Sequence, residues 1–143
     1  MAVKKEYNSF SDGNPLGDQE FLGQRALLVD DNEINLKVLE VRLQKKGFKT
    51  TITTNPKEAL ELLDSHSFDL VLLDLIMPEI TGLEILDFVR KKHSAIELPV
   101  IMTTAQLESG HIVSAFDKGA NDYITKPIDF KVAWARIKIG RAH

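Results

Sequence analysis

The chain has 143 residues, of which 43% are hydrophobic and 27% charged, a balance typical of one globular domain with a sizeable core. Its formal net charge of -3 provides no global basic field to attract nucleic acid or an anionic membrane surface. The absence of cysteine excludes disulfides, thiolate metal sites and cysteine nucleophiles. No apolar run is long enough for a membrane span or for a signal-peptide core, so we expect a cytoplasmic protein without membrane contact.

The first 23 residues differ in composition from the rest of the chain. They combine turn-forming residues with scattered apolar ones and show no sustained period. We predict a flexible leader over residues 1–23, with Phe10 or Phe21 as the side chain that would dock on the domain. A single folded domain is expected over residues 24–143.

The domain begins with a buried strand over residues 26–29, which ends in Asp30-Asp31. Asn32 is a typical N-cap for a helix that runs to about residue 46, and Gly47 is its stop signal. In this helix one face carries Ile34, Val38 and Val41, with Leu36, Leu39 and Leu43 adjoining. A second strand is expected over residues 48–53. Asn55-Pro56 then opens a second helix whose core face carries Ala59, Leu60 and Leu63.

The central strand lies within Phe68-Asp-Leu-Val-Leu-Leu-Asp-Leu-Ile-Met-Pro78. Its continuous apolar run over residues 71–73 favours a strand that is buried on both faces. Asp74 follows at once, and Pro78 prevents the strand from continuing. After a loop that ends at Gly82, the residues Leu83, Leu86 and Val89 indicate a third helix.

The last third of the chain continues the alternation. Residues 100–103 form a fourth strand with Thr104-Ala105 just beyond it, and a fourth helix lined by Ile112, Val113 and Phe116 stops at Gly119. Residues 123–125 form a short fifth strand that is closed by Lys126-Pro127. A last helix runs from about residue 129 towards the C-terminus.

Strands that alternate with helices predict an α/β fold with a parallel sheet covered on both faces. We expect the flavodoxin-like (βα)5 three-layer sandwich with strand order 2-1-3-4-5, which sets the first and third strands side by side. Ligands bind outside the carboxyl ends of strands in such sheets. The order therefore gathers Asp30, Asp31 and Asp74 in one crevice.

Three neighbouring carboxylates repel one another, so one should have a raised pKa unless a cation neutralises them. Mg²⁺ suits such a site, because it binds through few carboxylates and keeps several waters. With that metal bound, Asp74 can attack a phosphoryl group in line and form an aspartyl phosphate. Lys126 is placed to pair with the phosphoryl oxygens and Thr104 to donate a hydrogen bond to them.

Asp30-Asp31, Asp74 in LLDLIMP, Thr104-Ala105 and Lys126-Pro127, in this order, resemble the receiver domain of two-component response regulators over about residues 25–139. The resemblance implies that Asp74 is the phosphoacceptor and that Asp30, Asp31 and the backbone carbonyl of Ile76 complete the magnesium ligands. It also implies phosphoryl contacts from Thr104 and Lys126, an aromatic switch at Tyr123 and a cis peptide before Pro127.

The same resemblance implies a switch rather than a turnover enzyme. A sensor histidine kinase, a phosphotransfer protein or a small acyl phosphate would supply the phosphoryl group. The response would appear on the face of the fourth helix, fifth strand and fifth helix, which is also a possible homodimer interface. Ile76 and Gln106 would flank the hydrolytic water, and we expect slow to moderate loss of the phosphoryl group.

The chain ends at Gly140-Arg-Ala-His143, a poor terminus for an amphipathic helix, and GANDYITKPIDF with the following Ala-rich helix is similar to receivers fused to nucleotide-cyclase (for example diguanylate cyclase) outputs. An excised module without direct nucleic-acid contact is therefore one expectation, and a free-standing receiver is another.

Three other classes of protein remain open. A haloacid-dehalogenase-type phosphatase needs a second Asp where Ile76 stands, and a flavodoxin needs a phosphate loop where Asp-Asp-Asn-Glu stands. A degenerate receiver that serves only for docking would usually lack an acidic or Lys position, and none is missing here.

Overall fold

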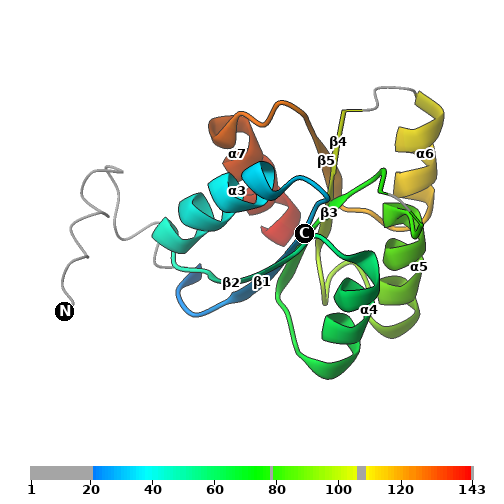
Figure 1. The fold of residues 1–143 in the computed structure, drawn as a ribbon, viewed down its shortest axis with the longest axis horizontal. Coiled ribbons are helices and arrows are strands. Elements are labelled where there is room, and N and C mark those ends of the chain that lie inside the picture. The colour runs from blue at the N-terminus through cyan, green and yellow to red at the C-terminus, as the bar shows by residue number, and fades with distance from the viewer. Residues whose placement is uncertain (1–20, 78, 106–108, 143) are drawn as a thin grey trace.

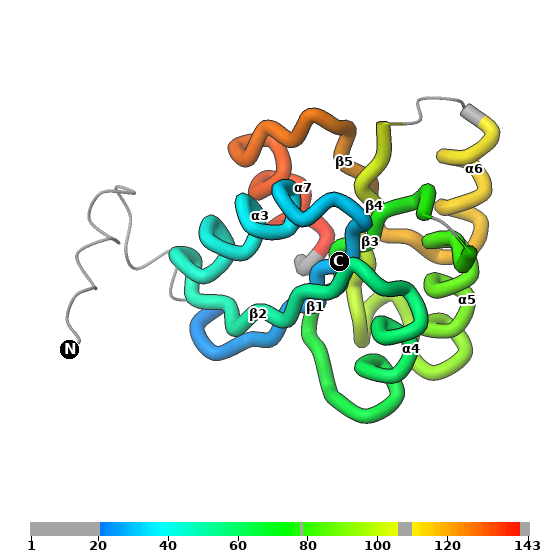
Figure 2. Tube along the Cα trace, in the orientation of Figure 1, coloured from blue at the N-terminus to red at the C-terminus, as the bar shows by residue number. Residues whose placement is uncertain are grey.

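The computed structural model describes residues 21–77, 79–105 and 109–142. Within them the chain forms a five-stranded sheet of order β2-β1-β3-β4-β5 in which every pairing is parallel (Figures 1 and 2). The predicted fold class and strand order are therefore confirmed. The strands are β1 (Arg25–Val29), β2 (Lys49–Thr53), β3 (Leu70–Asp74), β4 (Val100–Thr104) and β5 (Asp122–Thr125).

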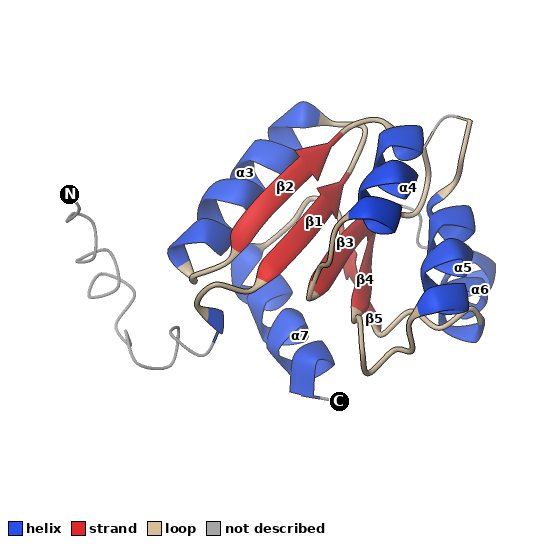
Figure 3. Ribbon diagram, turned by 90° about the horizontal axis from the view of Figure 1, so that it is seen from below, coloured by secondary structure: helices blue, strands red, loops and turns tan. Residues whose placement is uncertain are grey.

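Helices cover the two faces of the sheet unequally (Figure 3). The helix bounds are α3 (Glu33–Lys45), α4 (Pro56–Ser65), α5 (Gly82–Lys92), α6 (Ser109–Asp117) and α7 (Phe130–Ala142). On one face α3 and α7 pack against Leu28, Leu72 and Ile101, and on the other α4, α5 and α6 pack against Leu27, Leu73 and Met102. Among the helices of the described segments, none is long and apolar enough to cross a membrane.

Three of the helices begin at a capping side chain. The side chains of Asn32 and Asn55 accept hydrogen bonds from the first backbone N–H groups of α3 and α4, as their sequence positions predict. Gly47 ends α3 with a φ of 101°, which only glycine adopts without cost. Thr81 and Glu84 form a capping box at the start of α5, and this cap was not among the sequence predictions.

The buried faces of two helices differ from the predicted ones. In α3 the residues Leu36, Leu39 and Leu43 are buried, whereas Ile34, Val38 and Val41 are exposed. In α6 the buried residue is Ala115, and Val113 and Phe116 are exposed. Both helices carry apolar residues on more than one side, so the helical period alone does not determine which side meets the sheet.

The described part of the chain begins at Phe21, and this residue is already packed into the domain. Its ring stacks on Phe48 at 5.5 Å between centroids and meets Trp134 edge-on at 5.4 Å. The backbone N–H of Gly23 donates to the carbonyl of Gly47. Phe21 therefore docks on the domain as predicted, and residues 1–20 of the predicted leader, with Phe10, lie outside the described residues.

Candidate functional site

The carboxyl ends of β1, β3, β4 and β5 bring the predicted site residues to one edge of the sheet. Val29 pairs with Leu73 and Asp74 pairs with Thr103, so Asp30 and Asp74 follow neighbouring rungs of the sheet. Thr104 pairs with Thr125, the residue before Lys126. Parallel strands end on the same side of the sheet, so Asp30, Asp74, Thr104 and Lys126 all lie at this edge.

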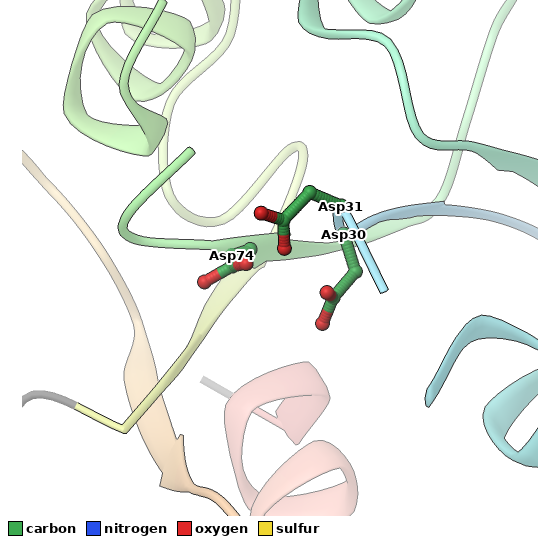
Figure 4. A group of neighbouring side chains, drawn as sticks. All are labelled: Asp30, Asp31 and Asp74. Carbon is green, nitrogen blue, oxygen red and sulfur yellow. The ribbon is translucent and has the colours of Figure 1, made fainter. Parts of the chain in front are cut away.

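Asp30, Asp31 and Asp74 form one acidic cluster. Each offers a carboxylate oxygen, and these atoms lie within 4.8 Å of one another. Figure 4 shows the three side chains together where β1 and β3 end. Asp30 and Asp74 are only 2% and 3% exposed, whereas Asp31 is exposed to solvent. The cluster thus has two carboxylates inside the protein and one at its mouth.

Lys126 joins the two buried carboxylates. Its Nζ lies 3.0 Å from Oδ2 of Asp30 and 3.2 Å from Oδ2 of Asp74. The backbone N–H of Ile76 donates to Oδ1 of Asp74 at 3.3 Å, and that of Asn32 donates to Oδ1 of Asp30 at 2.8 Å. The cluster therefore contains three carboxylates and one ammonium, and its formal charge is negative.

These surroundings shift the proton affinities of the two central groups. Burial first, and then the neighbouring Asp30, raise the pKa of Asp74 from 3.8 to about 6, although Lys126 and the N–H of Ile76 act in the opposite direction. Burial alone would lower the pKa of Lys126, but the close ion pair with Asp30 and the charges of both carboxylates raise it. Asp74 is thus the carboxyl of the cluster whose pKa is raised, and burial contributes more to the rise than repulsion from Asp30 does.

The donor set fits a hard divalent cation. All three side chains offer carboxylate oxygens, which are the ligands that Mg²⁺ takes in proteins. Oδ2 of Asp30 is buried and has no hydrogen bond among the described residues, so its ion pair with Lys126 leaves it able to bind a cation. The side chain of Ile76 is 45% exposed and offers no ligand atom, so only the backbone of this residue can contribute one.

Gly82 brings the start of α5 against the site. A Cβ at this position would lie 2.2 Å from the carbonyl oxygen of Asp74 and 2.9 Å from Cα of Leu75. The N–H of Gly82 donates to the carbonyl of Leu75 at 3.0 Å. The sequence showed Gly82 only as a loop terminus, because the close contact depends on the tertiary structure.

Thr104 and Tyr123 lie on the other side of β4 and β5 from Asp74. Strand alternation puts both on the face of Met102, which packs against α5 and α6. Thr104 is buried, and the half-buried ring of Tyr123 lies 6.1 Å edge-on from Phe116 and 5.2 Å from Cζ of Arg136. The Lys126-Pro127 peptide is cis, as predicted. Two predicted features, Pro78 and Gln106, lie outside the described residues.

Comparisons with known proteins agree with this geometry. A family model described as "Response regulator receiver domain" matches residues 26–138. The chain is 39% identical over 112 residues to the uncharacterized transcriptional regulatory protein YkoG of Bacillus subtilis (strain 168), which covers 78% of this chain and 48% of YkoG. The chain spans about half the length of the curated relatives it matches.

Solved structures show the same fold. A CheY-like response regulator receiver domain protein from Methanospirillum hungatei JF-1 is 27% identical, with a TM-score of 0.78 over 84% of this chain and 94% of that chain. The response regulator TrrA from Thermotoga maritima, in complex with Mg(2+)-BeF, is 32% identical, with a TM-score of 0.72 over 82% of this chain and 98% of that chain.

Proposed function

The chain belongs to the response regulator receiver domains, and from this membership we propose that it accepts a phosphoryl group on Asp74 from a sensor histidine kinase or a phosphotransfer protein. The observation that carries the proposal is the edge of the sheet where Asp74 lies buried beside two further acids and one lysine. The family match over residues 26–138 also supports residues 24–143 as the receiver domain, with residues 1–23 leading into it. A cytoplasmic location stays a prediction.

The proposed reaction is an in-line displacement. An oxygen of Asp74 attacks phosphorus, and the bond to the imidazole nitrogen of a phosphohistidine, or to the oxygen of a small acyl phosphate, breaks with its electron pair on the leaving group. A Mg²⁺ ion held by Asp30, Asp31, Asp74 and the carbonyl of Ile76 would neutralise charge on the phosphoryl oxygens. The complex of TrrA with Mg(2+)-BeF supports this metal.

Lys126 and Thr104 would hold the product. Lys126 already contacts Asp74, so its ammonium needs only a short shift to pair with a phosphoryl oxygen. Thr104 ends β4 beside Lys126 and would donate its hydroxyl to another phosphoryl oxygen. Because the phosphoryl group stays on the protein as a signal, we propose a phosphoacceptor and not a turnover enzyme.

The proposed output face consists of α6, β5 and α7. Movement of Thr104 toward the phosphoryl group would vacate space on the face that it shares with Tyr123, and the tyrosine ring would move inward. Val113 and Phe116 of α6 are exposed, and the ring of Phe116 lies edge-on to that of Tyr123. An exposed apolar surface whose shape depends on Tyr123 supports this face as a homodimer interface.

Mass spectrometry of the intact protein tests the reaction. After incubation with acetyl phosphate and Mg²⁺, we expect one phosphoryl adduct, which should be absent in Asp74→Asn and after chelation of the metal. Asp87→Asn is a matched control, since Asp87 lies on α5, where its partly exposed side chain forms an ion pair with Lys118. An adduct that persists in Asp74→Asn, or that forms equally well with chelator, contradicts the proposal.

The alternative classes have less support. A haloacid-dehalogenase-type phosphatase would need a carboxylic acid where the exposed Ile76 stands. A flavodoxin would bind phosphate after β1, where Asp30 and Asp31 would repel it. A degenerate receiver used only for docking would still fold as observed, and the absence of any adduct would favour it.

The predicted output domain of the whole protein, a nucleotide cyclase, is not part of the receiver fold. YkoG is named a transcriptional regulatory protein, so it gives the predicted nucleotide-cyclase output no support. We propose that any contact with DNA would come from a part of the protein beyond this domain, because the chain itself has a net charge of -3. The cyclase output stays a prediction.

The lifetime of the phosphoryl group depends on how water reaches it. Ile76 follows Asp74 by two residues and its apolar side chain is exposed beside the site, where it would order water poorly. We propose slow to moderate self-dephosphorylation, which Ile76→Asn should change. Identical rates of phosphate loss in Ile76→Asn and the parent would show that Ile76 does not control dephosphorylation.

A further inference from the structure

Thr103 is a buried polar residue that the proposed reaction does not use. It lies in β4, where it is paired with Asp74 of β3 on one side and with Ile124 of β5 on the other. Its side chain is 1% exposed, and its hydroxyl oxygen has no hydrogen-bond partner in the part of the chain that the structure describes. A buried hydroxyl normally has at least one partner.

Strand alternation fixes the side of the sheet to which this hydroxyl belongs. Thr103 shares its face with Ile101, which packs against α3 and α7. Asp74 shares the same face with Leu72, and Lys126 follows Ile124 of this face by two residues. Thr103 is therefore next to Asp74 and on the side of the ion pair, whereas Thr104 belongs to the side of Tyr123.

An unpaired buried hydroxyl costs free energy that a valine of similar shape would not cost. The residues around Thr103 on its face, Leu72, Ile101 and Ile124, are apolar and buried. Packing alone thus gives no reason for a hydroxyl at this point. Among the described residues, register and alternation place the charged groups of Asp74 and Lys126 on the same face as its hydroxyl.

We propose that Thr103 is a positioning residue of the phosphorylation site, whose hydroxyl is unpaired in the unphosphorylated protein and accepts a hydrogen bond from Lys126 once Asp74 carries the phosphoryl group. This inference rests on the proposed function. An ammonium has three N–H donors, and the contacts of Lys126 described above are with Asp30 and Asp74. When Asp74 becomes an acyl phosphate, Lys126 shifts toward a phosphoryl oxygen, and a remaining N–H of its ammonium can then donate to the hydroxyl of Thr103.

A hydrogen bond that forms only in the loaded state favours that state selectively. Thr103 then gives the ammonium an uncharged acceptor on the face where it already lies, which holds it within reach of the phosphoryl oxygens. Since the gain is that of about one hydrogen bond, we expect an effect of about tenfold on binding of a phosphoryl mimic.

The experiment compares Thr103→Val with the parent in two measurements. The first is the urea midpoint of the unphosphorylated protein, which should rise because an unpaired hydroxyl is removed. The second is the affinity for beryllofluoride with Mg²⁺, followed by ¹⁹F NMR, which should fall about tenfold. Thr103→Ser keeps the hydroxyl and should restore most of the affinity.

Thr53→Val is the matched control. Thr53 is also a buried threonine in the sheet, but its hydroxyl donates to Glu58 and accepts from the N–H of Asn55. This variant should lower the urea midpoint and leave the beryllofluoride affinity unchanged. A lower midpoint in Thr103→Val, or an affinity equal to that of the parent, would overturn the inference. Failure of the parent itself to bind beryllofluoride would overturn the proposed function and this inference with it.

Discussion

The two ends of the sheet each hold a half-buried cation, and the groups around the two cations differ in kind. At the amino ends of β4 and β5, Arg90 donates to the carbonyls of Leu98 and Gly119 at 2.8 Å and to Oδ1 of Asn121 at 2.9 Å. Two more contacts join it to the carbonyls of His93 and Ser94. Burial lowers the pKa of Arg90, but an arginine keeps its charge in proteins.

At the carboxyl ends, Lys126 contacts two carboxylates of a cluster of three acids, and polar atoms of Asp30 and Thr103 have no hydrogen bonds in the described segments. The Arg90 cluster has neutral acceptors for its donors and nothing to gain from a ligand. The Lys126 cluster carries excess negative charge, and binding of a cation and a phosphoryl group would stabilise it. At the amino ends of the strands all the groups around the cation are paired, which indicates a structural role. At the carboxyl ends charges and polar atoms are left unbalanced, which indicates a binding site.

Arg90→Ala should give the largest loss of stability. It removes one side chain that joins the end of α5 to the starts of β4 and β5, and leaves several partly buried carbonyls without a donor. We expect the free energy of unfolding to fall by about 3–5 kcal/mol. Urea unfolding measures this, and Arg90→Lys should recover little, since lysine lacks the planar fork. A loss below about 1 kcal/mol would contradict the view of Arg90 as a saturated structural centre.

Gly82→Ala probes the opposite end with a single methyl group. Its Cβ would meet the backbone of Asp74 at 2.2 Å, which cannot yield as a side chain does. We expect a loss of about 3 kcal/mol, at the upper end for overpacking, together with slower phosphorylation because the carbonyl side of Asp74 is displaced. The control is Gly110→Ala in α6, where a Cβ meets nothing within 4 Å and the protein should gain about 0.5–1 kcal/mol.

The sequence predicts the functional end better than the structural one. Asp30, Asp74 and Lys126 each follow an apolar strand directly, so the fold class alone brings them together. Arg90 has no such signal, because its acceptors come from two loops, α5–β4 and α6–β5, that only the tertiary structure brings together. The buried sides of α3 and α6 were mispredicted for a related reason: apolar residues on two sides of a helix leave the choice to packing. Thr103 was predicted only as strand, since pairing of its hydroxyl depends on neighbours across the sheet.

A third prediction concerns the pH dependence of the incomplete cluster. Because burial raises the pKa of Asp74 from 3.8 to about 6, the folded chain holds this proton more tightly than the unfolded chain. The free energy of unfolding should therefore fall as the pH rises between these two values and stay level above them. Asp74→Asn cannot ionise, so its stability relative to the parent should increase over the same interval, to on the order of 2 kcal/mol at pH 7.

Urea unfolding of both proteins at several pH values from 4 to 7.5 provides the test. If the free energy of unfolding changes with pH in the same way in Asp74→Asn and the parent, the buried carboxylate of Asp74 does not destabilise the protein. Excess Mg²⁺ should reduce the difference between the two proteins at neutral pH, since a bound cation favours the charged carboxylate. The same additions should leave Arg90→Lys unchanged relative to the parent.

The smallest predicted effect compares backbone strain at the two ends. Three glycines adopt positive φ just before strands, at Gly23, Gly47 and Gly119, whereas Glu79 adopts a φ of 68° in the loop after β3. A side chain in this conformation costs free energy, and asparagine tolerates it better than glutamate. Glu79→Asn should therefore stabilise the protein by about 0.5–1 kcal/mol, and Glu79→Gln, which keeps the backbone penalty, should not. If the strain helps to shape the loop beside Asp74, Glu79→Asn will also change the rate of phosphorylation by acetyl phosphate. An unchanged rate with raised stability would show that the strained loop does not serve the reaction, and that only the charged groups distinguish this end of the sheet.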